Sequence, residues 1–371
     1  ENKMNSDISP HIEENEAYIR KRLENCDDFI IRPMILGEEK KIRCLVVYIE
    51  VAVSNMVLED SVIGKLVNHM WEMPAEEILE FVRENGMGIS DVQPMDSMDQ
   101  AFASMLAGNA LFFLDGYARA IKVSSKGYPN LSVSEATREK VLRGSKEGFT
   151  DAVKTNSALV RKRIRDTRLK VKQKTIGKRS QTLVQILYME DLVRPELLED
   201  LEKRLDSFVI DGVLDSGVIE QLTESSWLSP FPQFQTTERP DKCAAEILNG
   251  RIVLLCDHSP MGILLPAVFN DFLQVSEDSY NRFEIVSLQR IIRYCAVLIT
   301  LLFSGTYLAV TNFHTQVLPT NLILSFSEAR QGVPFPGMLE ILFMEIAFET
   351  IREAGIRMPG PLGGTIGIVG G

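Results

Sequence analysis

The sequence lacks the patterns typical of disulfide-linked proteins, structural zinc sites and secretory signals. Its five cysteines include no C-x-x-C pair. Disulfide frameworks and structural zinc sites need closer, paired spacing, so we expect buried, reduced thiols. The first 22 residues are polar and charged, and they lack the apolar segment of a secretory signal. We therefore expect the folded region to stay in the cytoplasm.

Catalytic and cofactor-binding patterns are missing as well. The chain has no G-x-S-x-G elbow, P-loop or H-E-x-x-H motif, and no two of its four histidines stand at metal-ligand spacing. Its glycine-rich end, residues 363–371, resembles the start of a dinucleotide fold, but neither a helix nor an acidic residue follows it. The start of another membrane helix fits that segment better. These absences predict a protein that is not an enzyme and that has no cofactor or bound metal.

The net charge of −11 argues against a dedicated nucleic-acid-binding protein. One run differs from the rest, because residues 161–179 contain ten Lys or Arg and only one acid. The run has no aromatic residues for base stacking, which disfavours RNA or DNA as its partner. A solvated face is the simpler interpretation. The alternative is a face turned toward anionic lipid by Arg161, Lys162, Arg163 and Arg165.

Charge is absent from residues 294–327. As a helix, the most apolar part of this segment, residues 294–312, would be about 28 Å long, close to the roughly 30 Å hydrocarbon thickness of a bilayer. Its small and hydroxylated residues weaken insertion but suit packing against other membrane helices. Arg282, Arg290 and Arg293 precede it, so the positive-inside rule predicts a cytoplasmic N-terminal region. The alternative is a buried core helix of a soluble protein.

An internal repeat occupies the first two-thirds of the chain. Residues 15–23 reappear as residues 156–164, with Asn, Ala and the Arg-Lys-Arg run at matching places. About the same offset relates three further pairs of segments: 36–37 with 176–177, 48–50 with 188–190, and 99–108 with 241–250. Four matches in register indicate a duplicated structural unit.

Both copies predict the same order of elements. A short helix carries the basic run, and a two-stranded ribbon turns at the glycine of 36–37 or 176–177. An amphipathic helix follows, clearest over residues 195–205. Asp99 and Asp241 are predicted N-caps of a further helix that ends at Gly108 or Gly250. Apolar strands then follow at 110–115 and 252–257, and at 118–123 and 262–265.

This order predicts an α/β fold: two related α/β subdomains with mixed sheets, followed by a helical membrane region. Ser, Gly, Pro and alternating charges between the copies indicate a linker. The predicted limits are a first α/β subdomain at 1–123, a linker at 124–150, a second α/β subdomain at 151–275, and a membrane region at 276–371.

A last helix is expected over about residues 338–354. Glu345, Glu349 and Arg352 fall within a narrow arc of it, with Glu340 elsewhere. One interpretation is an amphipathic helix at the membrane interface whose polar stripe faces water. The other is that Glu345 and Glu349 line a polar membrane path between subunits, because ionisable groups at membrane depth are usually functional.

Asp115 and Asp257 end equivalent strands, where active-site carboxylates often lie, although turn residues are the simpler explanation. They belong to the main alternative for the whole chain: a soluble two-domain α/β small-ligand binder or enzyme with a cleft between the repeats.

Several longer motifs resemble a known family. They are spread over nearly the whole chain: Gly148-Phe149-Thr150, Ile210-Asp211-Gly212, Ser229-Pro230-Phe231-Pro232-Gln233, Thr237-Glu238-Arg239-Pro240-Asp241, Val333-Pro334-Phe335-Pro336, and Glu345 to Gly355 with the closing glycine-rich run. Together they resemble the A subunit of GerA-type spore germination receptors.

The resemblance implies a germinant receptor in the inner membrane of bacterial spores that contains B and C subunits. It implies a two-part cytoplasmic N-terminal region, several membrane spans, and homo-oligomers that conduct ions in response to nutrients. It supplies no catalytic residues. The family pattern continues into further membrane helices, so we expect this chain to be a fragment.

Overall fold

The computed structural model describes residues 7–36, 42–52 and 92–357, apart from 125–126, 129–135, 137–138, 140, 142–143, 227, 230, 330 and 333. The chain divides into two compact units, Glu1–Tyr280 and Asn281–Gly371. The first unit contains both sequence repeats, and the second contains the uncharged segment. Gly37 and residues 53–91 lie outside the described residues.

The first repeat forms a five-stranded sheet in the order β1-β2-β4-β5-β3. Its elements are α1 (Ile12–Arg22), β1 (Phe29–Leu36), β2 (Ile42–Ile49), β3 (Val92–Met95), α4 (Met98–Leu106), β4 (Ala110–Leu114) and β5 (Ala120–Val123). Apolar residues of α1 and α4, such as Ile19 and Phe102, pack on one face of the sheet with Val47 and Phe113. The repeat thus has its own apolar core.

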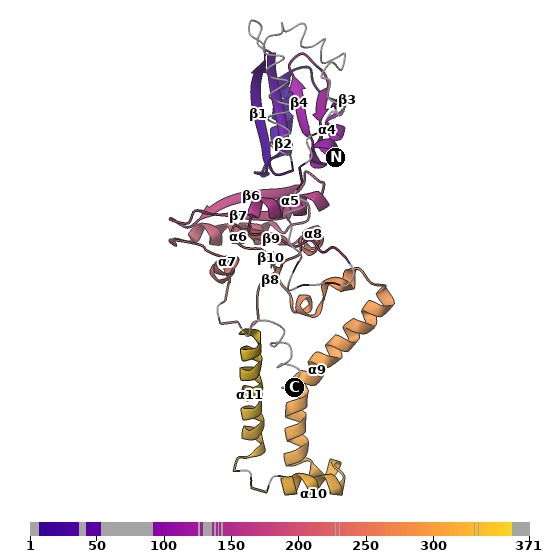
Figure 1. Ribbon diagram of the computed structural model, residues 1–371, viewed down its shortest axis with the longest axis vertical. Coiled ribbons are helices and arrows are strands. Elements are labelled where there is room, and N and C mark those ends of the chain that lie inside the picture. Colours follow the sequence, from indigo (N-terminus) through magenta and orange to yellow (C-terminus); the bar gives the residue numbers. More distant parts are fainter. Residues whose placement is uncertain are drawn as a thin grey trace. The chain divides into compact units, whose positions relative to one another are not determined.

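The second repeat forms a sheet of the same order, β6-β7-β9-β10-β8. Its elements are α5 (Val153–Arg163), β6 (Leu169–Ile176), β7 (Thr182–Met189), α6 (Pro195–Ser207), α7 (Ser216–Thr223), β8 (Gln235–Thr237), α8 (Pro240–Leu248), β9 (Ile252–Cys256) and β10 (Gly262–Leu265). The matching order confirms the duplication and the α/β class. Helices α5 and α8 cover one face of this sheet, and α6 and α7 cover the other (Figure 1).

The prediction of mixed sheets is wrong, because every pair of adjacent strands in both sheets is antiparallel. Helix α4 does connect two parallel strands, β3 and β4, but β5 lies between them, and β10 separates β8 from β9 in the same way. In the first repeat, the hairpin β4-β5 follows α4, and its second strand, β5, lies between β4 and β3. A sequence pattern of strand, helix, strand does not reveal which strand fills that gap.

The predicted N-caps are also wrong, although the predicted helix ends are confirmed. The N-cap of α4 is Ser97, whose side chain accepts a hydrogen bond from the Gln100 amide, and that of α8 is Arg239, with proline at the first helical position. The two aspartates stand in the first turns, where a negative charge also suits the helix dipole. Gly108 and Gly250 follow the helices with φ of +94° and +85°, a conformation that favours glycine.

Phe149 lies at the end of the predicted linker and packs in the core between α5, α8 and the second sheet. Its exposed fraction is 2%, and its backbone N–H donates to the Glu238 carbonyl at 2.8 Å. The last residues before α5 therefore contribute to the second repeat. The subdomain limits themselves remain predictions.

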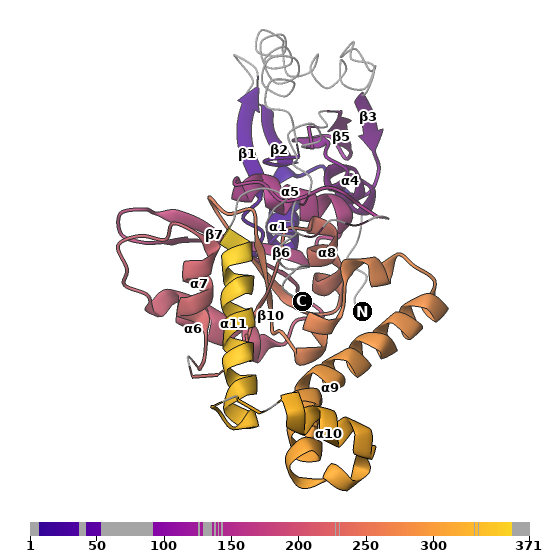
Figure 2. The same cartoon turned by 60° about the horizontal axis from the view of Figure 1, so that its bottom comes forward.

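The second unit is helical. It consists of α9 (Phe283–Phe313), the short helix η4 (Thr315–Val317), α10 (Thr320–Ala329) and α11 (Gly337–Arg357), and α10 lies at the C-terminal end of α9 (Figure 2). Among the described residues, α9 is the one helix long and apolar enough to cross a membrane, and its apolar segment is not buried. The helices predicted over 294–312 and 338–354 are confirmed, and both are longer than predicted; α10 was not predicted.

Candidate functional site: the repeat junction, the chain before the long helix, and the glutamates of the helical unit

A buried ion pair joins the two repeats. Arg161 on α5 donates from Nε and Nη2 to the two carboxylate oxygens of Asp28, each at 2.8 Å. Its Nη1 donates to the Leu169 carbonyl at 2.9 Å, and the guanidinium lies 5.0 Å from the centre of the Phe29 ring. Two parallel bonds from a planar guanidinium fix both distance and orientation. Since Asp28 belongs to the first repeat, this pair sets how the repeats meet.

Both members of this pair are buried, and burial affects the pKa of the carboxyl. Arg161 has no exposed surface, and Asp28 is 7% exposed. Burial raises the pKa of the Asp28 carboxyl, while the bonds from Arg161 oppose that rise. Removing charges from water is costly, so such a pair persists only when each partner satisfies the other. Cys26 lies beside it, and burial likewise raises the pKa of that thiol.

The loop before β1 also protects an edge of the second sheet. The Asp27 amide donates to the Val171 carbonyl at 2.9 Å, and the Gln173 amide donates to the Asp27 carboxylate at 2.7 Å. Both acceptor and donor lie on β6, the outer strand of that sheet. Pairing of an edge strand removes a site of unwanted strand addition.

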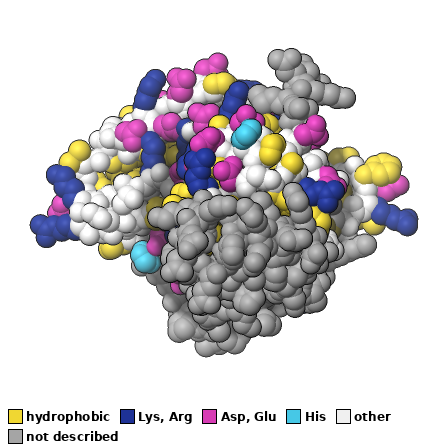
Figure 3. All heavy atoms as spheres, turned by 90° about the horizontal axis from the view of Figure 1, so that it is seen from above, with side chains coloured by type: hydrophobic (Ala, Val, Ile, Leu, Met, Phe, Trp, Pro, Cys, Tyr) yellow, Lys and Arg dark blue, Asp and Glu magenta, His cyan; other side chains and the backbone are white. Residues whose placement is uncertain are grey.

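The prediction that Arg161 faces lipid is wrong, because its guanidinium is enclosed at the junction. In the sequence Arg161 resembles its basic neighbours. Only in the folded chain does the contact with Asp28 make it a buried residue. Lys162 and Arg163 are partly exposed and pair with Glu147 at 3.3 and 2.5 Å, and Arg165 is exposed. Lipid contact of these three residues remains a prediction. On the face shown in Figure 3, basic and acidic side chains are interspersed.

Asp115 and Asp257 have equivalent structural roles. Asp115 accepts a hydrogen bond from the Ile12 amide at 3.2 Å, and Asp257 accepts one from the Val153 amide at 3.1 Å. Both amides begin a helix, where backbone donors have no partner within the helix. The two carboxylates therefore hold the first turns of α1 and α5 against the ends of β4 and β9.

The repeated asparagines complete this arrangement. The Asn156 side chain exchanges two hydrogen bonds with the Thr150 backbone, at 2.8 and 2.6 Å, and Asn15 does the same with Ser9, at 3.0 and 2.7 Å. Both asparagines are buried. Burial of an amide requires such partners, which explains why the repeat is visible at these positions.

A second buried cluster, which the sequence did not predict, lies at the end of the first unit. Arg239 is 1% exposed and donates to both carboxylate oxygens of Asp241, at 3.1 and 2.6 Å, while the Tyr280 hydroxyl donates to the same carboxylate. Arg251 binds Asp271 similarly, at 2.7 and 2.8 Å. These bonds hold residues 268–280, the chain that leads to α9, against α8 and the second sheet. The one available signal was the Thr237 to Asp241 motif.

This cluster predicts a defined loss of stability in acid. Arg239 and Tyr280 hold the pKa of Asp241 below its usual value despite the opposing effect of burial. The resulting stabilisation is present above the unfolded-state pKa of about 3.9 and is lost as pH falls through the lower folded-state value. In thermal unfolding followed by near-ultraviolet circular dichroism from pH 7 to 3, Asp241→Asn is expected to lower the midpoint most at neutral pH. The difference from the native chain should shrink below about pH 4.

Asp206, whose side chain is 69% exposed, provides the matched control. Asp206→Asn should change the midpoint little at any pH, because exposed ion pairs contribute about 0–1 kcal/mol. A constant difference between the native chain and Asp241→Asn down to pH 3 would contradict the assignment.

In the helical unit, Glu345 contacts the long helix. The Ser304 hydroxyl on α9 donates to the Glu345 carboxylate on α11 at 3.1 Å. Glu349, one turn further along α11, forms an ion pair with Arg352. The two glutamates thus have different partners, and a polar path through them remains a prediction.

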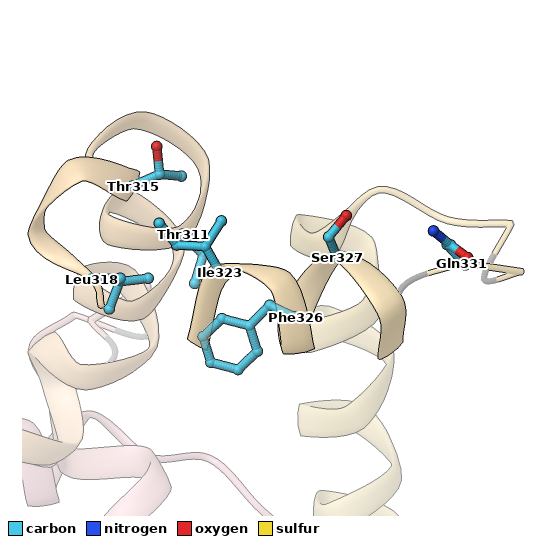
Figure 4. Close-up of a pocket in the computed structure, with 7 residues that line it drawn as sticks. All are labelled: Thr311, Thr315, Leu318, Ile323, Phe326, Ser327 and Gln331. Atoms are coloured by element: carbon cyan, nitrogen blue, oxygen red, sulfur yellow. The ribbon is translucent and has the colours of Figure 1, made fainter. Parts of the chain in front are cut away.

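An open hollow of about 310 Å³ lies where α9 ends and α10 begins. Figure 4 shows its lining of hydroxyl, amide and apolar side chains: Thr311, Thr315, Leu318, Ile323, Phe326, Ser327 and Gln331. The Thr311 hydroxyl already donates to the Tyr307 carbonyl at 2.8 Å. None of these side chains is charged, so the lining of the hollow provides no carboxylate of the kind that Glu345 and Glu349 carry on α11.

Among the residues that the structure describes, no group of three or more His, Cys, Asp or Glu side chains is arranged to hold a metal ion. What the geometry does define is a duplicated α/β unit, joined by a buried ion pair and followed by a helix suited to a membrane. These features define the class of a folded α/β region followed by a helix long and apolar enough to cross a membrane.

Comparison with known proteins identifies the family. The model of the "Bacillus/Clostridium GerA spore germination protein" family matches residues 17–371, so the chain belongs to that family. It is 36% identical over 370 residues to the uncharacterized membrane protein YfkQ of Bacillus subtilis, and this match covers 100% of this chain and 71% of that protein. It is 35% identical over 356 residues to the spore germination protein GerLA of Bacillus cereus, covering 95% and 71%.

A solved structure supports the same conclusion. The N-terminal domain of the A subunit of the Bacillus megaterium spore germinant receptor GerK3 superimposes with a TM-score of 0.56 and 29% identity. The match covers 72% of this chain and 99% of that domain. The resemblance seen in the sequence motifs is therefore confirmed, as is the fold of the N-terminal region.

Proposed function

We propose that this chain is the A subunit of a germinant receptor and that it converts germinant binding into ion release and germination. The observation that supports this most directly is the family match over residues 17–371, which spans both the folded unit and the helical unit. In this proposal the chain acts with B and C subunits and with further copies of itself. It is a signal-transducing subunit rather than an enzyme.

The proposed location is the inner membrane of the spore, with α9 as a span. A helix of 31 residues is about 46 Å long, which exceeds the roughly 30 Å hydrocarbon core. The charged first part of α9 then lies in the headgroup region, and the uncharged part after Arg293 crosses the bilayer. Arg282, Arg290 and Arg293 favour the cytoplasmic side for the folded unit.

Transduction requires two states of the helical unit with different affinities for the liganded partner subunits. The contact between Ser304 and Glu345 is a candidate for a contact that differs between those states, because it joins α9 to α11. Glu345 and Glu349 together are the proposed polar path for cations. Their carboxylates would replace part of the hydration shell of a passing ion.

The double substitution Glu345→Gln and Glu349→Gln tests this path. It keeps the shape of both side chains and removes their charge, so cation release from spores given nutrient is expected to slow severalfold, because a carboxylate attracts a cation more strongly than an amide does. Release is measured by flame photometry or an ion-selective electrode. The matched control is Glu340→Gln, on another face of the same helix, which should leave release unchanged. Equal release from the double variant and the native chain would rule out the path.

A further inference from the structure

An exposed apolar surface lies on two loops of the first unit, near the point where the chain continues to α9. We call it the apolar rim. It consists of six side chains: Leu228, Phe231, Val268, Phe269, Phe272 and Val275, which are 74%, 65%, 49%, 57%, 44% and 49% exposed. Two come from the loop before β8, and four come from the segment after β10. Val268, Phe269, Phe272 and Val275 lie within eight residues of one another in the chain, and exposed apolar side chains concentrated in this way usually mark an interaction site.

Hydrogen bonds hold the two loops side by side. The Ala267 amide donates to the Gln233 carbonyl at 2.9 Å, and the Gln235 side chain donates to the Asp271 carbonyl at 3.0 Å. These bonds tie the end of one loop to the segment that carries the other four side chains.

The polarity of the short helix η2 (Phe269–Leu273) is the reverse of that of an ordinary surface helix. Its Asp271 is 7% exposed and points inward, where the carboxylate binds Arg251 and accepts from the Val268 amide at 2.7 Å. Its Phe269 and Phe272 point outward. The charge is thus satisfied inside the unit while the aromatic rings are left outside, an arrangement that costs stability in water and suits an apolar environment.

The chain itself limits how far Tyr280 can lie from the uncharged part of α9. Tyr280 is bound to Asp241 of the first unit, and α9 begins three residues later at Phe283. Three residues span at most about 11 Å, and the eleven helical residues before the uncharged segment add about 16 Å. The chain between Tyr280 and the uncharged part of α9 therefore spans at most about 27 Å.

We propose that the apolar rim inserts into the headgroup and acyl boundary of the phospholipid bilayer and so fixes the folded unit on the membrane surface. This inference rests on the proposed membrane placement of α9. Apolar side chains of interfacial elements reach about 5–10 Å into this boundary, which side chains of Leu and Phe size can do without moving the polar backbone into hydrocarbon.

The test uses the full chain reconstituted in vesicles of phosphatidylcholine and phosphatidylglycerol. Cys295 is the exposed cysteine of the five and is replaced by Ser, whereas the other four are buried and their thiol pKa values are raised by burial. A single cysteine is then introduced as Phe231→Cys or Phe269→Cys and labelled with an environment-sensitive nitrobenzoxadiazole probe. Ile35→Cys is the matched control, since Ile35 is 51% exposed and lies on β1 of the first repeat.

Both rim probes are expected to shift their emission to the blue on reconstitution and to lose fluorescence when the vesicles contain lipids spin-labelled near the headgroup. The Ile35 probe should respond only to aqueous iodide. Each labelled variant is also unfolded thermally, and Val268→Cys replaces any variant whose midpoint falls. Rim probes quenched by iodide but not by spin-labelled lipid, in a chain that floats with the vesicles, would overturn the inference and indicate a protein partner. A chain that does not float with the vesicles would instead refute the proposed membrane placement.

Discussion

Replacement of Arg161 by Ala is expected to destabilise the folded N-terminal unit by about 3–5 kcal/mol, because it leaves the Asp28 carboxylate buried without a partner. The loss combines the two charge-assisted bonds to Asp28 with the bond to the Leu169 carbonyl. Equilibrium unfolding in urea of residues 1–280 measures it. The counterpart of this unit in GerK3 is a separate crystallised domain.

Arg20 is the control that the duplication itself provides. It occupies the same place in the first repeat, but its side chain is 55% exposed and pairs with Glu16 within α1. Arg20→Ala is therefore expected to cost less than about 1 kcal/mol. Replacing the junction pair by apolar residues, Arg161→Met with Asp28→Leu, should recover most of the stability lost in Arg161→Ala. Equal losses for Arg20→Ala and Arg161→Ala would contradict the role of the junction.

Replacement of Phe149 by Ala is the second change with a large expected effect. Phe149 is 2% exposed among α5, α8 and the second sheet, and its ring packs so closely on Gly262 that a Cβ there would lie 3.0 Å from it. Truncation of a buried phenylalanine costs about 3–5 kcal/mol, and the same urea unfolding of residues 1–280 measures the loss.

Phe231 serves as the comparison for Phe149, because it is 65% exposed on the apolar rim. Phe231→Ala should change the free energy of unfolding in water by less than about 0.5 kcal/mol. A small effect of Phe149→Ala would show that residues before α5 act as a linker and not as part of the second core.

The two repeats share one set of hydrogen bonds and differ in the contacts of one arginine. Asn15 and Asn156, and likewise Asp115 and Asp257, keep equivalent bonds in the two repeats. Arg161 and Arg20 do not, since Arg161 binds Asp28 of the first repeat, whereas Arg20 is largely exposed and pairs with Glu16 in its own helix. The shared bonds maintain each fold, and the differing residue joins the folds into one body.

The sequence by itself determined the duplication, the order of the helices and strands that it predicted, the uncharged helix and the family, whereas it did not predict β3, β8, α7 or α10. Each feature that it determined depends on local periodicity, on turn residues such as Gly108 and Gly250, or on motifs read along the chain. The glycines end α4 and α8 where predicted because a left-handed backbone conformation is a property of a single residue.

Only the tertiary structure decided which strands pair, which arginine is buried and which carboxylates hold which elements. The fully antiparallel sheets result from a hairpin strand that enters between β3 and β4, and nothing local to that strand specifies its neighbour. Arg161 is buried by Asp28, 133 residues away in the sequence, and Asp241 is bound by Tyr280 across 39 residues. Such pairs depend on the packing of distant segments, whose free energy arises only when both surfaces leave water together.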